Sequence, residues 1–191
     1  PTENVSMSVG ELEKNLGSLQ DASTRASAER FLAQHFAGSK DYDKAAQYIE
    51  KALQNPAITP ENKRDMLGQL ARMALLQKNY DKAASAIQNF LAVKQSSGDS
   101  ADAEIYLLLA QVQYKRRNYV ASAAAMDKAL SLQKNPTTEQ LKNALAIFYS
   151  TGSFDRAAQI MQRLVAADLN NAELWQQWTS LYLKAGKNAQ A

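Results

Sequence analysis

Aromatic residues recur along the chain at nearly constant spacing, each after a short polar turn and at the head of a run of small residues. They are Tyr42, Tyr80, Tyr119 and Phe154. The steps between them are 38, 39 and 35 residues long, which is in the range of solenoids built from helical hairpins. The pattern therefore predicts an array of one repeated helix pair.

Apolar residues recur at helical spacing on both halves of each repeat. On the expected first helices, the apolar sets are Phe31, Leu32 and Phe36; Leu67, Leu70, Ala71 and Ala74; Tyr106, Leu109, Ala110 and Val112; and Leu141, Ala144, Leu145 and Phe148. On the expected second helices, they are Ala45, Ile49, Ala52 and Leu53; Ala83, Ile87, Phe90 and Leu91; Met126, Ala129 and Leu130; and Ala157, Met161, Leu164 and Val165. Each set predicts one buried face of a helix. Its small members allow close helix contact, and its large members fill the space between hairpins.

Capping residues, proline and glycine separate the repeats. In Thr59-Pro60-Glu61, a hydroxyl side chain precedes a proline at the first helical position, where no backbone N–H is needed. Similar breaks occur at Ser97-Gly98-Asp99-Ser100 and at Asn135-Pro136-Thr137-Thr138-Glu139. We expect each break to separate one unit from the next.

On these residues the chain resembles the tetratricopeptide repeat (TPR) family. The third repeat matches the family pattern at Tyr106, Leu109, Ala110, Tyr119 and Ala129, and the fourth matches it at Leu141, Phe148, Phe154 and Ala157. The resemblance covers roughly residues 24–191. It implies an all-α fold, a right-handed superhelical solenoid of antiparallel helix hairpins.

The chain departs from the family pattern at several positions. Glu29 stands where a large apolar residue is expected, Ser122 replaces an alanine, and Phe90 replaces another. The steps of 38 and 39 residues exceed the family's 34 because the loops at residues 54–60 and 94–100 are long. Sel1-like repeats also run long but favour more glycine, and pentatricopeptide RNA readers need a basic groove; both stay minor alternatives.

The expected organisation is a series of units with one extra helix at each end. We expect an N-terminal amphipathic helix or cap at 1–23, units at 26–57, 64–97, 103–136 and 138–171, and the first helix of a fifth unit at 172–187. The N-terminal helix is predicted from Val5, Val9, Leu12, Leu16 and Leu19. A cap packed on residues 26–53 is favoured over a free partner-binding or coiled-coil helix. The apolar fifth helix indicates a chain that continues past Ala191, contact with a second copy, or a simple final cap.

Composition and charge exclude several kinds of site. The 22 basic and 19 acidic residues leave a net charge of only +3, whereas nucleic-acid binding usually needs a concentrated basic stripe. The basic run Lys115-Arg116-Arg117 is interpreted as a solvated turn. There is no cysteine, the single histidine is His35, and no phosphate loop, nucleophile elbow or EF-hand spacing is found. We therefore expect no catalysis, no cofactor, no metal site and no membrane span.

The resemblance implies where a partner binds. In the family, the first helices of the repeats line a concave groove that commonly takes an extended peptide or a helix. By register, the expected groove residues are Arg30, Gln34, Arg72, Leu75, Leu76, Leu107, Gln111, Tyr114, Lys115, Lys142, Ala146, Tyr149, Ser150 and Gln176. An apolar and aromatic centre with cationic neighbours predicts a partner segment with one or two large apolar side chains next to acidic residues. Packing between repeats is the alternative role for these residues.

These observations favour a non-catalytic scaffold for protein–protein interaction that assembles a multiprotein complex. The alternatives are a self-associating structural or spacer segment, or an accessory region of a larger enzyme or envelope machine. Family members that bind chaperone C-termini hold the terminal carboxylate with a set of Lys, Asn and Arg. Lys142-Asn143 resembles this set in one unit, but no full clamp forms, so a chaperone adaptor is not expected. The chain's composition, rich in Ala, Gln, Asn and Lys, resembles that of bacterial envelope proteins of the family, which favours a periplasmic or envelope location.

Overall fold

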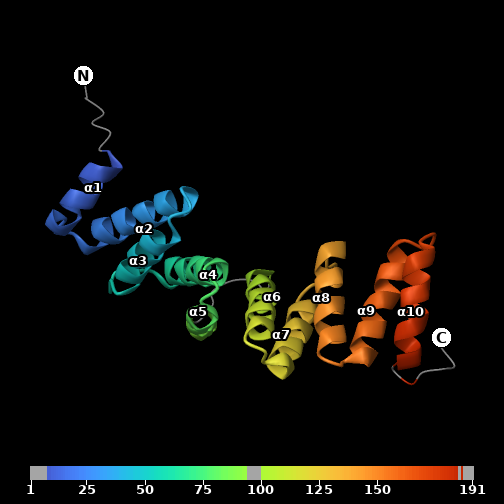
Figure 1. Ribbon diagram of the computed structural model, residues 1–191. Coiled ribbons are helices and arrows are strands. Elements are labelled where there is room, and N and C mark those ends of the chain that lie inside the picture. Colours follow the sequence, from blue (N-terminus) through green and yellow to red (C-terminus); the bar gives the residue numbers. More distant parts are fainter. Residues whose placement is uncertain (1–7, 94–99, 185, 187–191) are drawn as a thin grey trace. The chain divides into compact units, whose positions relative to one another are not determined.

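The computed structural model describes residues 8–93, 100–184 and 186. The chain divides into two compact units, 1–97 and 98–191, and each is described by itself. Within the described residues, all regular secondary structure is helical (Figure 1). This confirms the predicted all-α class, while the right-handed superhelix stays a prediction.

Unit 1 contains two helix hairpins preceded by a short helix. Its elements are α1 (Val9–Asn15), the 3-10 turn η1 (Leu16–Ser18), α2 (Ala22–Gly38), α3 (Tyr42–Leu53), α4 (Pro60–Leu76) and α5 (Tyr80–Ala92). The helices α2 and α3 form the first hairpin, α4 and α5 form the second, and α3 packs against α4.

Unit 2 contains two further hairpins and one more helix. Its elements are α6 (Ser100–Lys115), α7 (Tyr119–Ser131), α8 (Thr138–Ser150), α9 (Phe154–Ala167) and α10 (Ala172–Lys184). The pairs α6–α7 and α8–α9 are the hairpins, α7 packs on α8, and α10 packs on α9. Among the described residues, no helix is both long and apolar enough to span a membrane.

The predicted starts of the second helices are confirmed. The helices α3, α5, α7 and α9 begin at the four recurring aromatic residues, Tyr42, Tyr80, Tyr119 and Phe154. In three of the turns before them, the side chain of Asp41, Asn79 or Asn118 caps the helix by accepting a backbone N–H. The polar residue before three of the four aromatics therefore caps its helix, which explains why it recurs, whereas the Ser153 side chain forms no capping bond.

One backbone conformation closes each first helix within a hairpin. Lys40, Lys78 and Arg117 have φ between 59° and 63°, and Gly152 occupies the same place with φ 72°. This left-handed residue lets the next backbone N–H return to a carbonyl five residues earlier, as in the 2.8 Å bond from Ser153 to Phe148. Three of these turns hold this conformation without glycine, so glycine spacing could not reveal the repeat.

The start of the chain differs from the single amphipathic helix that was predicted. The helix α1 ends at Asn15, Leu16–Ser18 forms a 3-10 turn, and Leu19 is extended, with φ −69° and ψ 107°. Gly17 disfavours a continued α-helix here. Val5 lies outside the described residues.

The short helix α1 is tied to the first hairpin. The Tyr48 hydroxyl donates to Glu13 Oε1 at 2.7 Å, and Lys44 Nζ lies 3.7 Å from the same oxygen. Burial, followed by the bond to Glu13, raises the pKa of Tyr48 to about 12. These contacts hold α1 against α3.

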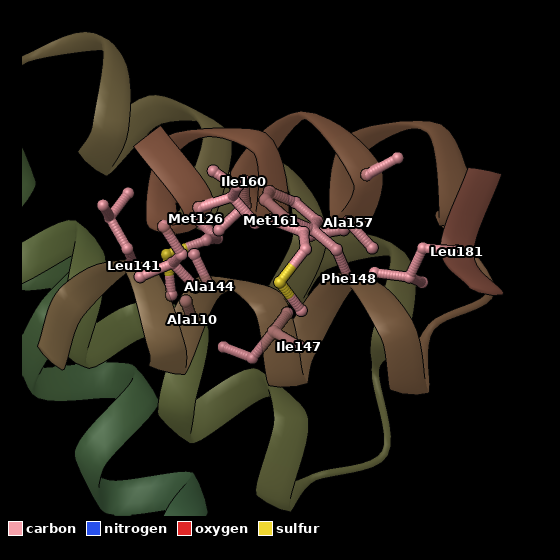
Figure 2. Packing of buried hydrophobic residues seen from close by; sticks show 14 of the residues in the cluster. Ala110, Met126, Leu141, Ala144, Ile147, Phe148, Ala157, Ile160, Met161 and Leu181 are labelled. Carbon is pink, nitrogen blue, oxygen red and sulfur yellow. The ribbon is translucent and has the colours of Figure 1, made fainter. Parts of the chain in front are cut away.

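The core of unit 2 alternates small and large side chains. Figure 2 shows Ala144 and Ala157 among Met126, Met161 and Phe148, all of them buried. The alanines let the helices approach closely, and the larger residues fill the space between hairpins. The predicted apolar sets on α7, α8 and α9 thus form one continuous core, with Leu130 and Leu145 only partly buried at its edge.

The apolar face predicted for α2 needs one correction. Phe31 is 52% exposed, whereas Leu32, Ala33 and Phe36 are buried. Phe31 lies on the same side of α2 as the exposed residue Gln34, away from the buried stripe. It therefore faces solvent and does not contribute to the predicted buried face.

Glu29 occupies a buried position on α2, at the place where the family pattern has an apolar residue. It is 6% exposed and lies one and two turns before Ala33 and Phe36 on the same stripe. Burial raises the pKa of the Glu29 carboxyl, and the charges of Arg25 and Lys51 oppose this shift.

We expect Glu29→Gln to become more stabilising as pH rises. The pKa of Glu29 is raised in the folded chain, so the wild type is stabilised by this group at low pH and loses that contribution as pH rises through the folded pKa. Glutamine does not titrate there. Urea unfolding followed by circular dichroism from pH 4 to pH 7.5 should show a growing gap between the free energies of unfolding of Glu29→Gln and of the wild type. Glu61→Gln, in the exposed first turn of α4, is the control; a gap independent of pH would contradict the argument.

Candidate functional site

The predicted groove residues divide between the two units, so the structure places them in two sets. In unit 1, Arg30 Nη1 on α2 donates to Asn62 Oδ1 on α4 at 2.6 Å, which links the two hairpins. Leu75 is half-buried, and Leu76 is 62% exposed. Arg30 thus has a packing role, whereas Leu76 offers an apolar side chain to solvent.

The remaining two predicted residues of unit 1 are also accessible. Gln34 on α2 and Arg72 on α4 are exposed. Together with Leu76, they present polar and apolar groups to solvent on the first helices of unit 1.

On α6, the predicted residues separate into packing and exposed positions. Leu107 and Tyr114 pack against the core of unit 2, and the Tyr114 ring lies 5.7 Å from that of Tyr119. Gln111 and Lys115 are exposed. Tyr114 is therefore partly structural, and its replacement would test folding as well as binding.

The other five predicted residues are brought together around one cavity. A cavity of about 630 Å³ lies between α8 and α10, over α9. It is lined by Lys142, Leu145, Ala146, Tyr149, Ser150, Met161, Gln176, Gln177, Ser180 and Leu181. Its volume is in the range of pockets that hold a drug-sized ligand or a few side chains. We call it the α8–α10 cavity.

Half of the lining was missed by the sequence analysis. Leu145 and Met161 were predicted to lie on buried faces, and both pack in the core while also forming the cavity wall. Leu181 of α10 does the same. Gln177 and Ser180 lie, like Gln176, on the exposed side of α10. Helical spacing could have identified Ser180, which follows Gln176 by four residues on the same face, but not the adjacent residue Gln177.

Tyr149 is held in place at one side of the cavity. Its ring packs edge-on against Phe154 with centroids 5.7 Å apart. Lys184, at the end of α10, donates a hydrogen bond to the Tyr149 hydroxyl, and its ammonium lies 4.7 Å from the ring centroid. Although 45% exposed, Tyr149 is thus fixed between two helices, which lowers the entropy lost when it contacts a partner.

Charge in the cavity has one sign. Lys142 is the one ionisable cation in the lining, and no carboxylate lines the cavity. Lys184 adds a second positive charge beside Tyr149. The arrangement favours an apolar group accompanied by negative charge.

The described residues offer little for other chemistry. Among them, no cluster of three or more His, Asp or Glu side chains could hold a metal ion. His35 is exposed on α2, with its ring 5.4 Å from that of Phe36.

Neither a protein-family model nor a curated protein matches the sequence, but solved structures match the fold. MamA has a TM-score of 0.67 with 16% identity, covering 86% of this chain and 85% of that protein. YrrB, a TPR protein, has a TM-score of 0.66 with 14% identity, covering 94% and 86%.

A third structure of this kind is a tetratricopeptide repeat protein from Parabacteroides merdae. Its TM-score is 0.61 with 16% identity, over 95% of this chain and 67% of that one. At these identities the likeness shows the fold. The chain therefore has the tetratricopeptide repeat fold, as its sequence repeats predicted.

Proposed function

We propose that this chain is a non-catalytic scaffold that binds a partner peptide or helix along its first helices. The observation that carries the proposal is the α8–α10 cavity, where five residues selected by register line one hollow. The same proposal includes a groove role for the other residues selected by register, which are Arg30, Gln34, Arg72, Leu75, Leu76, Leu107, Gln111, Tyr114 and Lys115.

The apolar wall of the cavity selects a large apolar side chain. Leu145 is half-buried at the cavity wall, and Ala146 on the same turn is exposed. Covering such surface gains roughly 25 cal/mol per Å² of apolar area removed from water. Leucine, methionine or phenylalanine on a partner would supply that area.

The polar rim recognises what surrounds the apolar side chain. Gln176 and Gln177 carry amides that can both donate to and accept from a peptide backbone. Lys142 and Lys184 favour an acidic residue next to the partner's large apolar side chain. The partner is thus a segment with one or two large apolar side chains next to carboxylates.

Similar structures support this type of function. YrrB is a TPR protein with an unusual peptide-binding site, and Cut9, at a TM-score of 0.61 and 17% identity, belongs to a hetero-tetramer with Hcn1. We extend from them the general role of a protein-binding scaffold that assembles a complex.

Self-association is the second candidate. Trp175 and Leu183 on α10, and Leu169 in the preceding loop, are exposed large apolar side chains. A surface of this kind can pair with another copy. A mass that rises with concentration at micromolar levels, in the absence of any partner, would favour this candidate.

We expect Tyr149→Ala to weaken peptide binding by about tenfold or more, because aromatic anchors dominate such interfaces. The probes are peptides enriched from a random phage-displayed library on the wild-type chain, and affinity is measured by fluorescence anisotropy. Tyr119→Ala is the matched control, since Tyr119 is 42% exposed but does not line the cavity.

Two outcomes would contradict the proposal. One is unchanged affinity in a Tyr149→Ala chain whose circular dichroism matches the wild type. The other is equal loss in the Tyr119→Ala control. Tyr114 is left intact in this test because its ring packs against the core.

A further inference from the structure

We propose that unit 1 carries a second peptide-binding pocket, where α3 and α5 end and α4 begins, which accepts a large apolar side chain next to an acidic residue. The cavity there has a volume of about 750 Å³. It is lined by Leu53, Gln54, Asn55, Pro56, Ile58, Pro60, Lys63, Leu67, Asn89, Ala92 and Val93. We call it the α3–α5 pocket, and it shares no residue with the α8–α10 cavity.

One wall of the pocket is the loop 54–59 between α3 and α4, through Asn55, Pro56 and Ile58. The step from Tyr42 to Tyr80 is 38 residues, against 34 for a typical tetratricopeptide repeat, but the extra length does not fall in this loop as the sequence predicted. The loop 132–137, in the shorter step of 35 residues, is equally long. The extra length lies in α4, which has 17 residues against 13 in α8.

Asn55 fixes the loop in this shape. Its side-chain nitrogen donates to the Ala22 carbonyl at 2.6 Å, which ties the loop to the start of α2. Its side-chain oxygen accepts the Ala57 N–H at 2.9 Å, and its carbonyl accepts the Ile58 N–H at 3.2 Å. The wall is therefore preorganised, which reduces the entropy lost on binding.

Apolar side chains form the floor. Leu67 is buried, whereas Leu53, Ile58 and Val93 are each only half-buried. Their exposed parts lie in the pocket lining and gain free energy if an apolar group covers them. The segment after Val93, from Lys94 to Asp99, consists of polar residues and glycine, so its sequence supplies no large apolar side chain.

Polar groups with unused bonding capacity surround this floor. The side chains of Gln54, Asn89 and Lys63 form no hydrogen bond or ion pair with any described residue, although all three line the pocket. Amide side chains donate and accept together, as a peptide backbone requires. They therefore fit a polypeptide better than a purely apolar molecule.

The positive charge of Lys63 determines which residue is favoured next to the partner's large apolar side chain. Lys63 is the one ionisable side chain of the lining. Its ammonium has no acidic neighbour in the lining to offset it, so a carboxylate on the partner is favoured. The occupant is thus a protein segment with a large apolar residue close to Asp or Glu.

The test uses the full chain with Tyr149→Ala, so that loss of the first site and loss of this pocket are separable. Peptides are enriched on this chain from a random phage-displayed library, and their affinities are measured by fluorescence anisotropy. We expect enriched sequences to place a large apolar residue within two positions of an acid. Lys63→Glu should weaken the binding of these peptides about tenfold or more, and Ile58→Ala should weaken it as well.

Lys128→Glu, an exposed charge reversal on α7, is the matched control and should leave affinity unchanged. Nuclear magnetic resonance gives a direct readout, since the side-chain amide signals of Gln54 and Asn89 should shift when peptide is added. Absence of enriched peptides, unchanged affinity in folded Lys63→Glu and Ile58→Ala chains, or amide signals that do not move would each overturn the proposal.

Discussion

Phe148→Ala will lower the free energy of unfolding by about 3–5 kcal/mol, the usual cost of removing a buried phenylalanine. Phe148 is 1% exposed on α8 and lies in the core shared by α7, α8 and α9 (Figure 2). Its backbone carbonyl also accepts the Ser153 N–H in the turn to α9, which brings α9 back over the ring. The substitution leaves a cavity that the surrounding helices can only partly fill.

Urea unfolding measures this effect through tryptophan fluorescence. Both tryptophans of the chain, Trp175 and Trp178, lie on α10 in unit 2, so the signal reports the unit that contains Phe148. Phe31→Ala is the matched control, followed by circular dichroism. It makes the same change at an exposed phenylalanine, and we expect an effect within about 0.5 kcal/mol. Equal effects would contradict the burial pattern.

Ala157→Leu will destabilise the chain by about 1–3 kcal/mol, because a larger side chain does not fit a close helix contact. Ala157 is fully buried on α9, in contact with the core around α8. The other hairpins have Ala45, Ala83 and Ser122 at the same distance after their aromatic residue, and all are fully buried. A small residue is therefore required wherever the two helices of a hairpin meet.

Ala166→Leu provides the control on the same helix. Ala166 is exposed, and alanine and leucine have similar helix propensities. We expect its unfolding midpoint in urea to match the wild type. If Ala157→Leu were equally harmless, the small residue would not be set by helix contact.

Sequence reasoning performed best where local chemistry decides the structure. The starts of α3, α5, α7 and α9 were predicted from the recurring aromatic residues and the polar residue before each. Thr59 and Pro60 mark the start of α4 as predicted, with the Thr59 hydroxyl accepting the Asn62 N–H. These signals act over a few residues, so they can be read directly from the sequence.

Burial was harder to predict because helical spacing identifies a face but does not say what covers it. Phe31 was placed on a buried face and is exposed, while the charged residue Glu29 is buried on the stripe of Leu32 and Phe36. The register of each residue around the helix, and the helices that pack on that side, decide between the two. Hydrophobicity alone would assign both residues wrongly.

The two cavities show the same limit for the candidate sites. The register predicted Lys142, Ala146, Tyr149, Ser150 and Gln176, which line the α8–α10 cavity, but it did not indicate Met161 on α9 or Leu181 on α10. Nothing in the sequence pattern indicated that Asn55 would tie the loop between α3 and α4 to the start of α2, where this loop forms a pocket wall. Both walls depend on contacts between residues far apart in the chain.

By itself, the sequence determined the repeated helix pair, the ends of most helices and the fold, because periodicity, caps and small residues act locally and recur in every unit. The tertiary structure alone decided which apolar side chains are buried, that Lys184 of α10 fixes Tyr149 of α8, and where cavities form. These features arise where separate helices and loops meet, so they are set by packing between segments and not by the pattern along any one of them.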